Sequence, residues 1–364
     1  MSELSGSPTR SGRARTLAQV YRRFGEVKAA GTSPLYERIA IALSESDEAL
    51  RAIEAAPARK RQPAVILAAL HDLALAGRAQ ALAAAYAGGD ADAAADAVID
   101  TLLRMTDAVV ATAVRRPTRT NETGRHAVLY PAIAEAARRV GASAVGLIDV
   151  GCSAGFNLSV DRVGISYGDG GTLGDPSSAV QQSALVVGDR PIPTRAIPEI
   201  TARVGVDLDP VDVTDADSAR WLRACVWPDQ LAEAATLDAE IALAATAPPL
   251  LLRGDAIEML PEALAQVPAD ALPIVTTTWA LSRFPLENRL RFLHRLDEAA
   301  TDRPVAWVSV EGVGVAPAIP TFGDRRASGH SIIGLTVFEH SALHAEAIGR
   351  CWSRGRSLAW LTGC

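Results

Sequence analysis

Residues 149–155 read DVGCSAG, and the fold of the chain depends on how this stretch is interpreted. Its last five letters, GCSAG, fit the pattern G-x-S-x-G, in which a sharp turn presents a nucleophilic serine. The whole stretch also fits a glycine-rich loop that lets a ligand approach the backbone closely. The first interpretation makes Ser153 a nucleophile, whereas the second makes it a small spacer between Gly151 and Gly155.

The sequence before the loop favours the second interpretation. A nucleophile elbow follows several strands and requires an oxyanion loop, then an acid and a histidine later in the chain. Only helical patterns and one apolar run, VGLIDVG, precede Ser153, and no HGGG-like segment occurs there. The later histidines lie in no recognisable catalytic context; they are His294, His330, His340 and His344. A serine hydrolase using Ser153 is therefore the minor alternative.

Acidic residues follow the predicted strands in an informative order. Asp149 ends the first strand, and Asp207 and Asp209 follow a second one in GVDLDP. A carboxylate at that place can accept hydrogen bonds from two ribose hydroxyls. Asp255, in RGDA after a third strand, can accept from an exocyclic amine. The structural alternatives stay open: Asp207 and Asp209 cap the next turn, and Asp255 is the N-cap of a helix.

Two kinds of patterning divide the chain. Residues 1–15 are polar and are expected to be a disordered tail, whereas 16–117 show helical patterns throughout and predict an all-helical domain. In 118–364, short apolar runs alternate with helical segments, which predicts a doubly wound, mostly parallel α/β sheet. A Gly- and Pro-rich insertion occupies about 164–198, where the alternation in ISY and SALVVG predicts a hairpin. Trp221, Trp227 and His71 are expected to be core residues.

Composition excludes several classes of protein. The chain has 364 residues, a net charge of -6 and four cysteines. An acidic chain argues against general nucleic-acid binding and against an anionic membrane surface. The cysteines form no metal-binding spacing, and no apolar run is long enough to span a membrane. We expect a cytoplasmic protein that binds no metal and inserts in no membrane.

These motifs together resemble the class I S-adenosylmethionine-dependent methyltransferases over about residues 119–364. DVGCSAG looks like their first motif, VGVDLDP like their second-strand acid, RGDA like their adenine-side acid, and TTTWAL like the strand edge that faces the acceptor. The resemblance implies a Rossmann-like fold and S-adenosyl-L-methionine as cofactor. It assigns Thr277 and Trp279 to the substrate pocket. The implied cofactor-binding residues are Asp149, Gly151, Ser153, Gly155, Asn157, Asp207, Asp209, Asp255 and Ala256.

Two features depart from the methyltransferase pattern. Ser153 replaces the middle glycine, and the second-strand acid comes far later than the spacing of about twenty residues expected in dinucleotide folds. If Asp207 and Asp209 are the wrong acids, Asp161 is the fallback. An NAD-binding domain ranks lower, because GCSAGF lacks the G-x-G-x-x-G spacing.

A second resemblance covers nearly the whole chain. SPLYERIA, RPTRTNETGR, DVGCSAGFNL, VGVDLDPVDV, RWLRACVWPDQ and GDAIEMLP are similar to a bacterial family known only as domain of unknown function 2332. This family brings no established reaction.

Candidates for catalysis lie further along the chain. Glu311, at the end of WVSVEG, and His330, in RRASGHSI, are the candidate general bases. The alternatives are a loop carboxylate and a solvated loop histidine. Asn121 and Arg125 lie before the first strand, where Arg125 can bind the carboxylate of the cofactor. A helix-capping network is the alternative for both.

The sequence thus predicts a methyltransferase that acts on a small molecule or a glycan. The alternative from another class is a non-catalytic cofactor-binding protein with the same fold. The N-terminal helices either cover the acceptor pocket or form a homodimer interface.

Overall fold

The computed structural model describes residues 16–118, 124–168, 170–340 and 342–363. These residues form two compact units. The smaller one consists of the described part of Met1–Thr120 together with Arg220–Ala234, and the larger one of the remaining described residues. Two boundaries between the units fall inside helices, α9 (Ala216–Ala224) and α10 (Leu231–Thr246).

The smaller unit is helical in all of its described elements. One of its helices begins with two typical start signals: the Ser33 side chain accepts a hydrogen bond from the Tyr36 amide, and Pro34 is the first helical residue. The helices are α1 (Leu17–Arg23), η1 (Phe24–Ala29), α2 (Pro34–Glu45), α3 (Asp47–Glu54), η2 (Ala58–Lys60), α4 (Pro63–Leu75), α5 (Gln80–Gly88), α6 (Ala91–Arg104) and α7 (Thr106–Arg115).

Segment 220–234 completes the core of this unit. The Trp221 indole donates to the Pro117 carbonyl over 2.8 Å and its side chain is buried. Trp227 packs against the rings of Phe24 and Tyr36, with centroids 5.9 and 5.4 Å away. Both tryptophans are therefore core residues, as predicted. Buried His71 is one as well, since its Nδ1 lies 3.2 and 3.1 Å from two carbonyl oxygens of the same segment.

Within the described residues, no single helix is long and apolar enough to cross a membrane. The pair α4 and α5 passes that test only when counted together, and the two helices are bent by 103° relative to each other.

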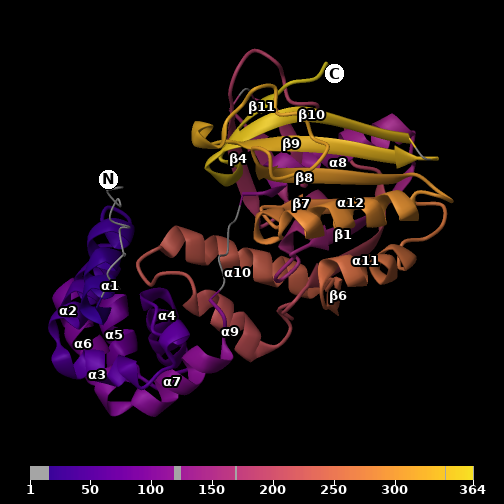
Figure 1. Ribbon diagram of the computed structural model, residues 1–364. Coiled ribbons are helices and arrows are strands. Elements are labelled where there is room, and N and C mark those ends of the chain that lie inside the picture. The colour runs from indigo at the N-terminus through magenta and orange to yellow at the C-terminus, as the bar shows by residue number, and fades with distance from the viewer. Residues whose placement is uncertain (1–15, 119–123, 169, 341, 364) are drawn as a thin grey trace, which may run out of the picture. The chain divides into compact units, whose positions relative to one another are not determined.

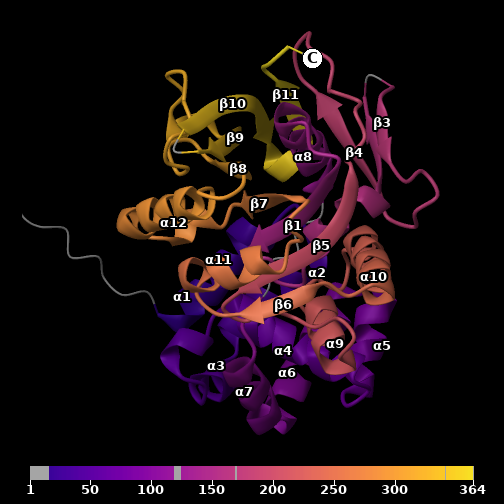
Figure 2. The same ribbon diagram turned by 90° about the vertical axis from the view of Figure 1, so that its right-hand side faces the viewer.

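The larger unit contains one extended sheet with the strand order β3-β2-β4-β11-β10-β9-β8-β7-β1-β5-β6. Figures 1 and 2 show these strands lying side by side. The strands are β1 (Ala144–Val150), β2 (Gly164–Tyr167), β3 (Thr172–Gly174), β4 (Gln181–Val186), β5 (Glu199–Asp207), β6 (Leu250–Arg253), β7 (Leu272–Thr278), β8 (Val305–Gly312), β9 (Ser331–Glu339), β10 (Ala342–Trp352) and β11 (Ser357–Trp360).

Strands β6, β5, β1, β7 and β8 form the parallel centre of the sheet. The chain builds β5 and β6 on one side of β1 and then places β7 and β8 on the other side. The connections after β1 and β7 therefore diverge, which creates the crevice in which open α/β sheets bind ligands. The predicted mixed α/β architecture with a mostly parallel sheet is confirmed.

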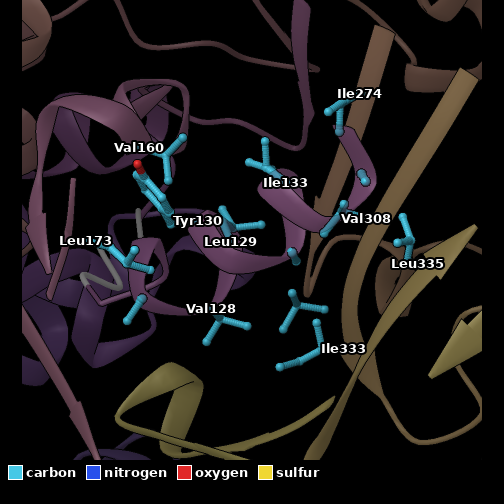
Figure 3. Packing of buried hydrophobic residues seen from close by; sticks show 14 of the residues in the cluster. Val128, Leu129, Tyr130, Ile133, Val160, Leu173, Ile274, Val308, Ile333 and Leu335 are labelled. Atoms are coloured by element: carbon cyan, nitrogen blue, oxygen red, sulfur yellow. The ribbon is translucent and has the colours of Figure 1, made fainter. Parts of the chain in front are cut away.

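Helices cover both faces of this centre, so its strands are apolar in both directions. Helix α8 (His126–Val140) packs on one face with Leu147, Ile274 and Val308, as Figure 3 shows for part of this cluster. Helices α11 (Ala256–Ala265) and α12 (Leu286–Ala299) pack on the other face with Ile148, Val275 and Trp307.

The Gly- and Pro-rich insertion extends the sheet. Strands β2 and β4 contain the ISY and SALV segments, but they pair in parallel, so the predicted hairpin between them is wrong. The antiparallel partner of β2 is the short strand β3, which the sequence pattern did not indicate. Strand β4 joins the main sheet by pairing with β11 at Leu185 and Val186.

Candidate functional site

The glycine-rich loop lies between β1 and the short helix η3 (Phe156–Arg162). Gly151 and Gly155 have φ values of 74° and 75°, in the left-handed region that glycine adopts without strain. A Cβ at Gly155 would lie 2.9 Å from a Pro249 side-chain carbon, so only glycine fits there. Ser153 also has a positive φ, 52°. The Gly151 amide donates to the Val206 carbonyl over 2.8 Å, which brings the loop to the end of β5.

Asp207 fixes this loop from the end of β5. One of its carboxylate oxygens accepts from the Ser153 amide at 3.0 Å, and the other accepts from the Asp209 amide at 2.9 Å. Asp207 is therefore both the turn cap that the sequence left open and a direct neighbour of the glycine loop.

The other two candidate acids have different partners. Asp209 is partly exposed and forms an ion pair of 2.6 Å with Arg253. Asp161, the fallback, forms two hydrogen bonds of 2.8 Å to Arg203. Because Asp207 bonds to the loop through the Ser153 amide, it is the best placed of the three for a ligand contact there.

Asp255 is the N-cap of α11, the structural alternative named above. Its Oδ1 accepts from the Ile257 amide at 2.9 Å and from the Glu258 amide at 3.4 Å. Ala256 is the first residue of this helix and is buried. The role of both residues at an adenine ring stays a prediction.

Asp149 is the centre of a buried polar network at the carboxyl ends of β1 and β7. Its carboxylate accepts from the Thr276 hydroxyl at 2.7 Å and from the Asn157 amide at 3.0 Å. Burial raises the pKa of Asp149 to about 6, although Thr276, Arg125 and Asn157 oppose the rise. The carboxylate gains a proton in the range where ordinary aspartates stay ionised.

Arg125 joins this network from the residue before α8. It donates to the Thr278 hydroxyl at 2.9 Å, and Asn157 donates to the same oxygen at 3.2 Å. The guanidinium also lies 5.3 Å from the centre of the Trp279 ring. Arg125 therefore lies beside the glycine loop, since Asn157 follows that loop, and its role toward the carboxylate of a cofactor stays a prediction. Asn121, its predicted companion, lies outside the described residues.

One of the two residues predicted to line the substrate pocket, Thr277, points away from the Asp149 network, because side chains alternate along β7. Thr276 and Thr278 point to the α8 face and bond to Asp149 and Arg125, whereas Thr277 between them points the other way. Thr277 is completely buried and accepts from the Trp307 indole at 3.1 Å. Thr277 is therefore a core residue of the α12 face, whereas Thr278, which is also buried, contacts Arg125 and Asn157. Period two along TTTW pairs Thr277 with Trp279, and this alternation ends after Thr278 because Trp279 lies beyond the strand and has a φ of 53°.

Glu311 lies on the α12 face of β8, because Val308 and Val310 point to the α8 face and the strand alternates. It is buried, and its Oε1 accepts from the amides of Ala280 and Leu281 at 3.0 Å each. Burial raises its pKa to about 7, against the effect of these amides. It thus fixes the turn after β7 rather than lying in a solvated loop.

His330 belongs to another cluster. Its Nε2 lies 2.9 Å from Asp324, which also accepts from Arg350 at 2.7 Å, and its ring packs 5.6 Å from that of Trp352. Its side chain is only 6% exposed, so the alternative of a solvated loop histidine is wrong. The structure does not bring His330 and Glu311 into the Asp149 network, and their role as bases stays a prediction.

Sequence reasoning missed a second buried group beside Arg125. His126 Nε2 donates to the Phe156 carbonyl over 2.9 Å, and its Nδ1 accepts from Gln182 at 2.8 Å. Gln182, on β4, also donates to Glu240 of α10 at 3.3 Å. Burial raises the pKa of Glu240 to about 7. No motif marks these residues, because they come from three segments far apart in the chain.

The chain can now be compared with known proteins. Residues 18–360 match a family model described as DUF2332, an uncharacterized protein conserved in bacteria. The chain belongs to the DUF2332 family. The loop, Asp207, Arg125 and Trp279 all lie inside the matched region. A search of curated proteins finds no match to this DUF2332 chain.

Proposed function

We propose that this DUF2332 protein is an S-adenosylmethionine-dependent methyltransferase with a small-molecule or glycan acceptor. The observation that carries the proposal is the contact between Asp207 and the glycine loop, at the carboxyl ends of adjacent parallel strands. The glycine loop itself is the connection after β1, which diverges from the connection after β7, and ligands of such sheets usually bind at that point.

The chemistry of the side chains suits this cofactor. A carboxylate offers about four acceptor positions, so the two backbone hydrogen bonds of Asp207 are compatible with an additional bond to a ribose diol. The Arg125 guanidinium matches the carboxylate of the amino-acid part in shape and charge. Asp255 and Ala256, at the start of α11, are assigned to the adenine side.

The protein residues then provide alignment. When bound, S-adenosylmethionine supplies an electrophilic methyl group for an in-line displacement. Arg125 orients the amino-acid part of the bound molecule and Asp207 its ribose, which reduces the entropic cost of reaching that alignment. When the methyl group is transferred to an oxygen or nitrogen atom, that atom also has to lose a proton. Glu311 and His330 are the proposed general bases that take it up.

Calorimetric titration with S-adenosylhomocysteine, the demethylated product, tests the proposal. We expect the wild-type protein to bind it and the Asp207→Asn variant to bind it about tenfold or more weakly, since the ribose loses a charged acceptor. Asp212→Asn is the matched control, because that exposed acid accepts from Thr214 in its own turn and should leave the affinity unchanged. Melting temperatures of both variants show whether the loop itself was disturbed. An absence of binding to the wild type would refute the proposal.

The titration alone does not separate the non-catalytic alternative, which also binds the cofactor. That protein would release no methylated product when it is incubated with S-adenosylmethionine and candidate acceptors. A serine hydrolase keeps one observation in its favour, the positive φ of Ser153 between a strand and a short helix. Among the described residues, however, no histidine ring makes a hydrogen bond to Ser153. Labelling by a fluorophosphonate probe that disappears in Ser153→Ala would support that alternative.

A further inference from the structure

A buried carboxylate in the larger unit has fewer partners than a buried charge normally has. The Glu240 side chain, on α10, is only 4% exposed. Within the part of the chain that the structure describes, its one hydrogen bond comes from the Gln182 amide at 3.3 Å. A carboxylate offers about four acceptor positions, and a buried charge is normally paired with an opposite one. Glu240 can therefore accept further hydrogen bonds from a cationic group.

Gln182 adds a second acceptor beside this carboxylate. Its Nε2 donates one hydrogen to His126 Nδ1 at 2.8 Å and the other to Glu240. Its Oε1 is buried and has no hydrogen-bond partner among the described residues. Gln182 as a whole is only 8% exposed. Such an acceptor can receive a donor from a bound molecule without giving up an existing hydrogen bond, and gaining that donor removes the cost of a buried unpaired group.

One ammonium group can reach both acceptors. The oxygen and nitrogen of an amide lie about 2.2 Å apart, so Gln182 Oε1 is at most about 5.5 Å from the Glu240 oxygen that accepts its Nε2. An ammonium nitrogen bonds to oxygens at about 2.9 Å, so it bridges two of them that lie up to about 5.8 Å apart. It also carries three donors and the positive charge that a carboxylate requires, whereas a hydroxyl supplies one donor and no charge.

The two acceptors lie next to the glycine-rich loop. His126, which receives the Gln182 amide, donates through its other nitrogen to the carbonyl of Phe156, the residue that follows this loop. Arg125 lies near enough to Glu240 for each charge to stabilise the other. The amino-acid part of S-adenosylmethionine carries a carboxylate and an ammonium group on one carbon atom. A ligand whose carboxylate lies near Arg125 therefore brings its ammonium group towards Glu240.

We infer that Glu240 and Gln182 form a subsite for the ammonium group of the amino-acid part of S-adenosylmethionine. The inference rests on the proposed function, because it takes this cofactor as the ligand. It depends on the two buried acceptors, and Arg125 contributes to it only through its charge. Glu240 thus recognises the amino-acid part of the cofactor, whereas Asp207 is assigned to the ribose.

Calorimetry of the full chain with two nucleosides tests the subsite. One is S-adenosylhomocysteine, and the other is its analogue in which a hydrogen atom replaces the amino group. We expect the wild type to bind the analogue about tenfold to a hundredfold more weakly. In Glu240→Gln, S-adenosylhomocysteine should lose a similar factor and the analogue should bind as before. Glu233→Gln, at an exposed acid of the same helix, is the matched control and should leave both affinities unchanged. Melting temperatures show whether either variant disturbs the fold.

The ratio of the two affinities should also depend on pH. Burial raises the pKa of Glu240 to about 7, against the effects of Arg125 and Gln182, and only the ionised carboxylate attracts an ammonium group. The ratio should therefore fall as the pH drops below about 7, and it should stay constant in Glu240→Gln. His126, 4.0 Å away, stays neutral over this range because burial lowers its pKa. Protonation of Asp149 acts on both ligands and cancels in the ratio.

Two outcomes separate the failure of this inference from the failure of the proposed function. Equal affinities of the wild type for both nucleosides, or a ratio that does not change with pH, would overturn the inference and leave the methyltransferase proposal intact. If the wild type binds neither nucleoside, that proposal fails. Methylammonium chloride is then titrated against sodium chloride while nuclear magnetic resonance follows the side-chain amide of Gln182, assigned with Gln182→Met. A saturable shift would keep the ammonium subsite, and the absence of a shift would overturn it as well.

Discussion

Asp149 links the stability of the protein to pH. Its pKa rises from 3.8 in an unfolded chain to about 6 in the folded state, mainly because it is buried. Between these two values the folded state binds more protons than the unfolded state, so this residue lowers stability as the pH rises through that window. At pH values above about 6, the free energy of unfolding that Asp149 removes is constant and on the order of 3 kcal/mol.

We therefore expect the difference in free energy of unfolding between Asp149→Asn and the wild type to depend on pH. The variant should gain stability relative to the wild type between pH values of about 4 and about 6, and no further above that range. Urea unfolding over this range measures it. Asp297→Asn, at an exposed position on α12, is the control and should show no such trend. A difference that stays constant with pH would contradict the burial argument.

Arg125 provides a test in which the ligand is changed as well as the protein. If its guanidinium holds the carboxylate of the cofactor, Arg125→Gln should weaken S-adenosylhomocysteine binding by about tenfold to a hundredfold. Binding of 5′-methylthioadenosine, which lacks that carboxylate, should change far less. Arg125→Lys keeps the charge but not the paired donors, so it should recover only part of the loss. Equal losses for both ligands would assign Arg125 a purely structural role.

At the scale of an element, successive side chains of strand β7 point to opposite faces of the sheet. We therefore expect Thr277 to contribute to stability and Thr278 to ligand binding. Thr277→Val removes the acceptor of the buried Trp307 indole, which should lower the free energy of unfolding by about 1–3 kcal/mol. The same change should leave the affinity for S-adenosylhomocysteine unaltered. Thr278→Val instead removes the hydroxyl that receives Arg125 and Asn157, and should weaken that affinity about tenfold. Denaturant unfolding and calorimetry of the two variants give both values, and identical behaviour would refute the assignment of faces.

At the scale of the whole molecule, the composition of the helical unit leads to a prediction. Residues 220–234 belong to this unit although they follow much of the larger unit in the chain. A fragment of residues 118–364 would keep Trp221 and Trp227 but lose their partners in the first helices. We expect this fragment to aggregate or to bind a hydrophobic dye, and co-expression with residues 1–117 to restore a well-folded protein. Size-exclusion chromatography shows the outcome. A monomeric fragment that unfolds cooperatively would show that the segment does not depend on those helices.

Local signals predicted much of this molecule. Some features depend only on neighbours a few residues away, so their patterns are visible in a single sequence. They include the apolar run before DVGCSAG, the acid after each strand, and the caps at Ser33 and Asp255. Contacts between distant segments are not visible there. Gln182 and Glu240 reach His126 only because β4 and α10 fold next to α8, and the parallel pairing of β2 with β4 depends on the same packing.

The strand β4 has a consequence for the order of synthesis. Residues 181–186 leave the ribosome long before Ser357–Trp360, the strand that connects them by hydrogen bonds to the central sheet. During translation of the intervening residues, one edge of β4 stays without its partner, and Leu185 on it remains 66% exposed even in the finished protein. A nonsense mutation between codons 187 and 357 would leave the insertion strands without that attachment, so a late truncation acts on residues synthesised near the middle of the chain.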